Sequence, residues 1–281
     1  MSPTYVLIML SERSSDIAVR QEAEEIVNEL LQKAHTATLY SGVSRIHLPE
    51  RGVIMVMTDF GGAFIARVYK KNGYYLIEVD FGKVTEKLLG RPVQLSTLSR
   101  STVRRYISAF LRNHYLRSYL VHEIVHKGMR DRGLEYNFKR HARDWTVGNR
   151  TLRAEVYHVT DTDVIFDTGE KLVKVRRNRL SDETLAEVDE WYEKSAAEYA
   201  NNHEEVSSWL NQAVYDLTFR AKGSANPVAV IGRDAGEFVD RVVDYLEDNG
   251  FWSRYSEKNK RSTRKRAYTS YADVVRQVTS A

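Results

Sequence analysis

Residues 120–126 read Leu-Val-His-Glu-Ile-Val-His, and His122 to His126 match the pattern H-E-x-x-H. On a helix, residues four apart project from one face about one turn apart, so both imidazoles can reach a single metal ion. Glu123 lies beside them, where its carboxylate can take a proton from a water molecule on that ion. The other residues of this segment are apolar: Leu120, Val121, Ile124 and Val125. The stretch therefore predicts a buried helix that carries a zinc site.

Residues that favour β-structure precede this helix. Two runs, residues 63–69 and 74–80, are joined by Asn72-Gly73, a strong hairpin signal because both residues tolerate positive φ. With the apolar run at residues 53–57, they predict a small antiparallel meander. Apolar residues at helical spacing over residues 102–130 predict one helix that contains the motif. Residues 134–147 are expected to form another helix, and residues 155–159, 163–167 and 171–175 short strands. Ser181-Asp182-Glu183 is expected to cap a long helix that runs to about residue 200. The pattern as a whole predicts an α+β fold.

The composition is that of a globular protein. The chain has 281 residues, of which 42% are apolar and 28% charged. It contains no cysteine, so a metal can be held only by histidines and carboxylates. No stretch approaches the roughly 18 apolar residues of a membrane span, and Met1 to Leu10 lacks the basic start of a signal peptide. We therefore expect a soluble protein of the cytoplasm or another intracellular setting, with no membrane partner.

Charge is distributed unevenly along the chain. The net charge is +4, yet residues 181–205 contain nine acids and one lysine. Arg254 to Arg266 instead contains seven Lys or Arg and one acid, interleaved with Tyr255 and followed by Tyr268. Clusters of basic residues attract phosphate groups, and nearby aromatic rings can stack on bases. This segment predicts a nucleic-acid partner, with a solvated tail or a tail paired with the acidic helix as the alternatives.

The third metal ligand must come from outside the motif. His141 lies 15 residues beyond His126, and Trp145 follows it at the fourth position. A glutamate on a later helix is an alternative ligand, for which Glu135 and Glu155 are the weaker candidates. This arrangement resembles the SprT-like metallopeptidases, which include Spartan. It consists of H-E-x-x-H, a linker of a dozen or so residues and then H-A-x-x-W. The resemblance covers about residues 60–147.

This resemblance implies a fold and an activity. The expected fold is a minimal zincin-like domain, in which His141 opens a second helix and the substrate adds as a strand at a sheet edge. Zinc would be held by His122, His126 and His141, with Glu123 as the catalytic base. Asp144 and Trp145 would lie around these ligands, and Asp144 is either a partner that orients a histidine or a solvated helix residue. The implied function is a zinc-dependent endopeptidase that hydrolyses peptide bonds of protein substrates near DNA. Residues 74–80 are the expected substrate-binding edge.

The expected domain organisation follows from the same pattern. Residues 1–150 form the metallopeptidase domain, 151–221 a small β segment with helices, and 222–281 a helical C-terminal region with a basic tail. An alternative function is a non-catalytic subunit of a larger assembly, such as a nucleoprotein or a viral particle, in which the zinc site is structural or degenerate. That alternative also allows a nucleoid-associated or viral setting.

Overall fold

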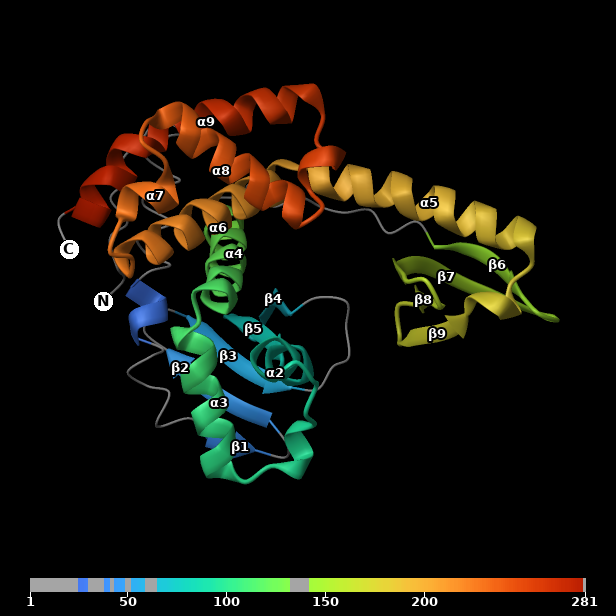
Figure 1. Cartoon of the computed structure of the whole chain (residues 1–281). Helices are drawn as coiled ribbons and strands as arrows, with labels where there is room; N and C mark the ends of the chain where they lie inside the picture. Colours follow the sequence, from blue (N-terminus) through green and yellow to red (C-terminus); the bar gives the residue numbers. More distant parts are fainter. Residues whose placement is uncertain are drawn as a thin grey trace.

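The computed structural model describes residues 25–29, 38–40, 43–48, 52–58, 65–131 and 142–279. These residues form a small mixed sheet, a four-stranded antiparallel sheet and a helical C-terminal region, so the expected α+β class is confirmed (Figure 1). None of the described helices is both long enough and apolar enough to cross a membrane.

The first sheet has the strand order β1-β2-β3-β5-β4. Its strands are β1 (Thr38–Tyr40), β2 (Val43–Leu48), β3 (Val53–Thr58), β4 (Ala66–Lys71) and β5 (Tyr74–Asp80). The hairpin predicted at Asn72-Gly73 is confirmed, with positive φ angles of 51° and 83°. The predicted antiparallel meander is wrong, because β3 runs parallel to β5 and skips β4. Strand β4 is therefore at one edge of the sheet, and residues 74–80, expected at the edge, lie inside the sheet.

Three helices follow the sheet: α2 (Phe81–Leu89), α3 (Arg100–Arg112) and α4 (His114–Asp131). The single helix predicted over residues 102–130 is divided at Asn113. Its backbone is extended there, with ψ of 118°, and its side chain accepts a hydrogen bond from the Leu116 amide at 3.1 Å. Asparagine caps a new helix in this way. Leu120, Val121 and Ile124 of α4 are buried in one core with the strands of the sheet.

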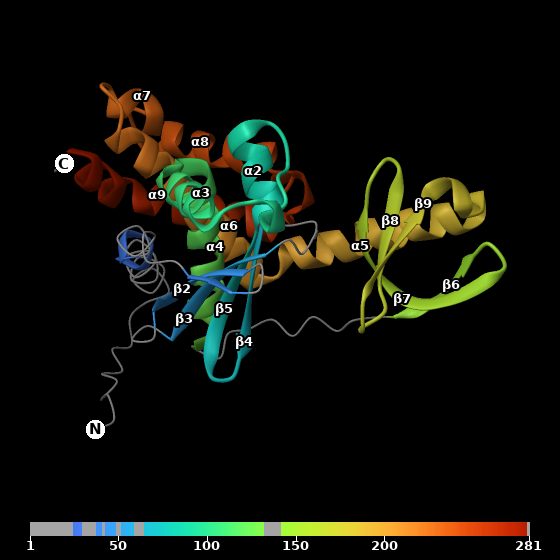
Figure 2. The same ribbon diagram turned by 90° about the horizontal axis from the view of Figure 1, so that it is seen from below.

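The second sheet consists of consecutive antiparallel strands: β6 (Arg143–Val147), β7 (Arg150–Val159), β8 (Asp163–Asp167) and β9 (Leu172–Arg176). It lies beside α5 (Asp182–Asn201), away from the first sheet (Figures 1 and 2). The strands predicted over residues 155–175 and the helix predicted from residue 182 are confirmed. The helix predicted over residues 134–147 is wrong in its described part, which is β6. The boundary predicted near residue 150 falls between two paired strands.

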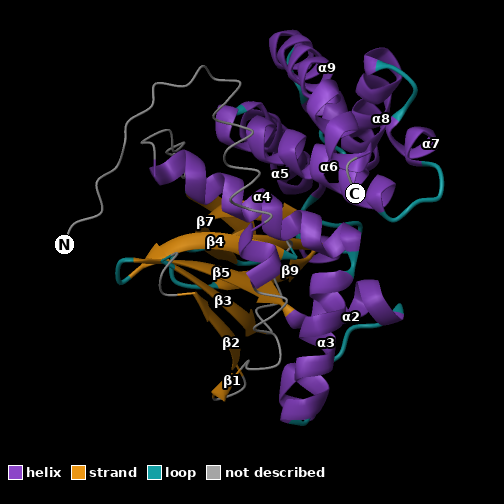
Figure 3. Cartoon of the chain, turned by 90° about the vertical axis from the view of Figure 1, so that its left-hand side faces the viewer, coloured by secondary structure: helices purple, strands orange, loops and turns teal. Residues whose placement is uncertain are grey.

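The C-terminal region contains α6 (His203–Lys222), α7 (Pro227–Ile231), α8 (Ala235–Asp248) and α9 (Glu257–Thr279). Helix α6 packs along α4 on one side and against α8 and α9 on the other (Figure 3). Apolar residues of α6 join both cores, since Tyr215 belongs to the core of the first sheet and Leu210 to that of the C-terminal helices. This packing brings the first turn of α6 beside the H-E-x-x-H motif.

Candidate metal centre

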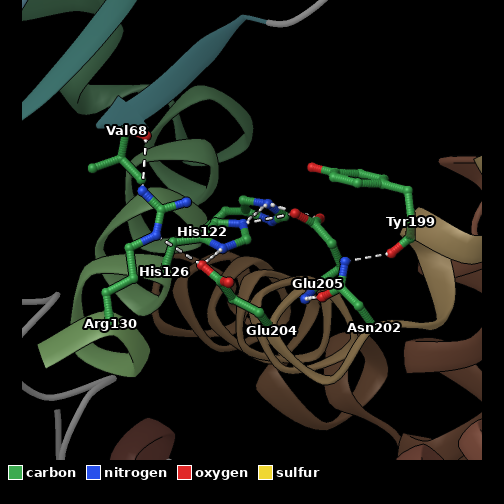
Figure 4. Close-up of polar contacts among 8 residues, drawn as sticks. All are labelled: Val68, His122, His126, Arg130, Tyr199, Asn202, Glu204 and Glu205. Carbon is green, nitrogen blue, oxygen red and sulfur yellow. Dashed lines mark hydrogen bonds and ion pairs between the residues drawn. The ribbon is translucent and has the colours of Figure 1, made fainter. Parts of the chain in front are cut away.

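The motif lies on α4, and His122, Glu123 and His126 are all buried. The two histidines share a helix face as predicted, and their Nε2 atoms are 3.0 Å apart. Helix α6 contributes Glu205, whose Oε1 lies 3.1 Å from Nε2 of His126 and whose Oε2 lies 3.6 Å from Nε2 of His122 (Figure 4). Side chains from two helices thus converge on one point.

These distances suit a tetrahedral metal ion. Ligand atoms about 2.0–2.1 Å from zinc are separated from one another by about 3.3 Å. The two imidazole nitrogens are 3.0 Å apart, and the two oxygens of Glu205 lie 3.1 Å from His126 and 3.6 Å from His122, so each of these contacts is close to that value. One ligand atom from each of the three residues lies within 4.8 Å of the other two. Oε2 of Glu205 is buried and accepts no hydrogen bond from the described residues. The buried His122, His126 and Glu205 group could therefore hold a metal ion.

Glu204 orients one of the ligands. Its Oε1 lies 2.7 Å from Nδ1 of His126, so in the neutral imidazole this ring nitrogen donates to the carboxylate and Nε2 has its lone pair available for a metal. Arg130 holds Glu204 in turn, donating from Nε to Oε1 at 3.1 Å and from Nη1 to the Val68 carbonyl of β4 at 3.2 Å. The helix, the ligand and the edge strand are linked by this chain of contacts (Figure 4).

A helix cap sets the position of both glutamates. Asn202 precedes α6, and its side chain accepts a hydrogen bond from the Glu205 amide at 2.8 Å. Adjacent residues of a helix point about 100° apart, so Glu204 can face His126 and Arg130 while Glu205 faces both histidines. Asparagine at this position and acids in the first turn are also what a stable helix start requires.

The group borders a cavity of about 210 Å³. Its lining comes from β4, α4, α5, α6, the cap residue between α5 and α6, and a residue after α8: Ala66, Arg67, Val68, Tyr119, His122, Glu123, His126, Arg130, Tyr199, Asn202, Glu204, Glu205, Trp209 and Phe251. Arg67 is matched by Glu78 at 2.6 Å. When both histidines are neutral, the carboxylates of Glu123, Glu204 and Glu205 carry three negative charges and Arg130 carries one positive charge, which leaves a net charge of −2. A divalent cation would neutralise them, which fits a metal at this point.

The metal-free site has strongly perturbed titration. Burial opposes a charge on His126, yet the carboxylates of Glu205 and Glu204 raise its pKa to about 10. Burial raises the pKa of the Glu123 carboxyl, although the neighbouring histidines act against this effect. Burial, followed by the charge of Glu205 and a hydrogen bond to it, holds the pKa of the Tyr199 hydroxyl well above its usual value. Tyr199 therefore stays protonated at neutral pH.

Other residues singled out in the sequence have different fates. His141 lies outside the described residues. Asp144, considered as a partner for a ligand histidine, is instead exposed and accepts a hydrogen bond from Arg153 at 3.3 Å. Trp145 was expected on a helix beside the metal, which is wrong. It lies in β6, fully buried in the core of the second sheet, and its indole donates to the Ala154 carbonyl at 2.8 Å.

Sequence reasoning missed Glu204, Glu205 and Tyr199. The two glutamates lie 78 and 79 residues beyond His126, and no spacing rule connects them to the motif. The available signal was a pair of acids directly after an asparagine cap, which also describes an ordinary helix start. Tyr199, near the end of α5, carried no signal.

Comparison with protein-family models, with curated proteins and with solved structures gives no match to this chain. The function is therefore argued from the residues of the site.

Proposed function

We propose that this protein is a zinc-dependent metallopeptidase of the zincin type, with His122, His126 and Glu205 as the metal ligands. The observation that carries the proposal is the convergence of donor atoms next to a buried glutamate of H-E-x-x-H: the two Nε2 atoms are 3.0 Å apart, and each has one oxygen of Glu205 within 3.6 Å. A histidine pair with one carboxylate is a ligand set used by catalytic zinc sites, which keep one position for water or substrate.

Glu123 is the proposed general base. When bound, zinc supplies a Lewis acid that acidifies a water molecule and polarises the scissile carbonyl. Glu123 would accept a proton as a water molecule adds to the scissile carbonyl, and would return it to the amine nitrogen as the C–N bond breaks. Its buried position suits this work, since burial raises the pKa of the carboxyl toward the range in which it can both accept and return a proton.

Tyr199 is the proposed donor to the developing negative charge. It lines the same cavity as Glu123 and approaches the ligands from α5 (Figure 4). Because its pKa lies well above the usual value, the hydroxyl keeps its proton and remains a hydrogen-bond donor. A donor aimed at the position where charge develops stabilises the transition state more than the substrate.

Strand β4 is the proposed binding edge for an extended substrate. Among the described residues β4 pairs only with β5, and Ala66, Arg67 and Val68 line the cavity. An extended peptide can add to such an edge through main-chain hydrogen bonds, which places its backbone alongside the metal ligands. Recognition through main-chain groups favours unfolded or loop segments of protein substrates.

Metal content and cleavage, measured together, test the proposal. Wild-type protein should contain about one zinc per chain and cleave a denatured, fluorescently labelled protein. Glu123→Gln should keep the zinc and lose at least about a hundredfold in rate, since it removes the general base. Glu187→Gln, an exposed acid on α5, is the matched control and should behave as wild type. Stoichiometric zinc without cleavage would favour a structural site in an assembly protein instead.

A further inference from the structure

We propose that the outer face of α9 binds a nucleic-acid strand through its phosphates, independently of the metal centre. This basic face consists of Lys258, Arg261, Arg264 and Lys265, with Tyr268 at its end. At 3.6 residues per turn these five positions fall within about one third of the helix circumference. All five are exposed, Tyr268 to 60%, and they span about 15 Å along the helix.

The four cations of this face are not balanced by carboxylates. Within the described residues none of them forms an ion pair, and the chain has no acid from Lys258 to Tyr268. The neighbouring bases differ in this respect. Lys260 is paired with Glu257 at 3.1 Å, and Arg254 lies 3.6 Å from Glu193 of the acidic helix α5. Unmatched positive charge along one stripe suits a regular polyanion, whose counterions are released on binding.

The buried side of α9 argues against a lipid surface. An interfacial helix inserts its apolar face among lipid tails. Here the apolar face is already covered, because Thr263, Ala267 and Val274 are buried against α6 and α8. Only the charged face remains available, as Figure 1 shows for the outer position of α9.

Aromatic side chains near this face favour a strand with accessible bases. Tyr268 projects from the basic face itself. At the other end, Trp252 lies under two cations, 5.3 Å from the Arg264 guanidinium and 5.9 Å from the Lys260 ammonium. Tyr268 is exposed and Trp252 is half-buried. Aromatic rings among cations are the arrangement that binds single strands, in which bases stack on rings while phosphates contact Lys and Arg.

Fluorescence anisotropy on the full chain tests this inference. The probes are a labelled single-stranded DNA of about 20 nucleotides and the duplex of the same sequence. The α9 variant carries Lys258→Gln, Arg261→Gln, Arg264→Gln and Lys265→Gln. The control variant loses the same charge at four exposed arginines in and near α3: Arg91, Arg100, Arg105 and Arg112. Helix α3 lies at the opposite end of the molecule from α9 (Figure 1).

We expect wild type and the control variant to bind the single strand alike and the α9 variant to bind at least tenfold more weakly. If all four cations contact phosphates, the slope of log K against the logarithm of the salt concentration should also be smaller in magnitude by about three for the α9 variant. Tyr268→Ala should weaken single-strand binding at least about fivefold and leave the duplex unaffected.

Three results would overturn the inference: no binding by wild type at low salt, equal losses in both charge variants, or competition by polyglutamate as effective as by the oligonucleotide. The last result would identify the face as a site for an acidic protein. All four substituted side chains are exposed, so the α9 variant should fold, which its circular dichroism spectrum checks. The metal centre shares none of these residues, so loss of peptidase activity cannot mimic this outcome.

Discussion

Replacing Glu205 by glutamine tests the central feature of the site, a metal ligand that comes from a second helix. The amide has nearly the same shape as the carboxylate but is neutral and a poorer zinc ligand. Structural zinc sites with four protein ligands bind the ion with about 10–16 kcal/mol, so one ligand corresponds to about 3 kcal/mol. We therefore expect zinc affinity to fall by roughly a hundredfold in Glu205→Gln.

The assay is a competition for zinc between metal-free protein and a chromophoric chelator at fixed pH. Glu204→Gln is a second variant for comparison, because it removes the carboxylate that orients His126. We expect it to lower the zinc affinity by about ten- to a hundredfold. His141→Ala should leave the affinity unchanged if Glu205 is the third ligand. Wild-type affinity in Glu205→Gln together with loss of zinc in His141→Ala would refute the assignment and restore the three-histidine site.

Other outcomes follow from the same contacts. Trp145→Ala should lower the free energy of unfolding by about 3–5 kcal/mol, measured by urea denaturation, and leave the zinc content unchanged because this indole lies in the second sheet. Zinc affinity should fall on acidification, by about tenfold per pH unit for each proton displaced. The reason is that His126, with its pKa of about 10, is protonated in the metal-free site at neutral pH and must lose that proton to bind the ion. Chelator competition at several pH values checks this. Asn202→Ala removes the cap of α6 and should cost about 0.5–2 kcal/mol in thermal or chemical unfolding, with weaker zinc binding because Glu205 shifts.

Features that depend on neighbouring residues were predictable from the sequence. The motif helix, the turn at Asn72-Gly73 and the cap at Ser181 each rest on contacts within a few positions. The break at Asn113 was also present in the sequence, as a capping residue inside an apolar helical pattern, but the continuous period concealed it. The parallel pairing of β3 with β5 was not predictable, because pairing between distant strands leaves no local signal.

Trp145 shows how a short pattern can mislead about secondary structure. Trp145 is followed by Thr146, Val147 and a glycine with φ of 59° at the turn into β7. Two residues that favour strands before a glycine at positive φ are typical of a hairpin. This local signal was correct for residues 143–147, where the helix expected from the resemblance is wrong. His141 as a ligand stays a prediction.

The position of Glu204 and Glu205 explains why the proposed third ligand was concealed. Acids in the first turn of a helix are ordinarily explained by the helix dipole, and such side chains lie in solvent. These two are only 3% exposed. Removing two adjacent carboxylates from water costs several kcal/mol each, far more than the dipole supplies, unless charged partners compensate. His126 and Arg130 compensate Glu204. His126 also compensates Glu205, which lies beside two imidazole nitrogens that a metal ion would turn into co-ligands. Burial of an acid pair at a capped helix start, rather than its position in the sequence, is therefore the property that distinguishes a ligand from a cap.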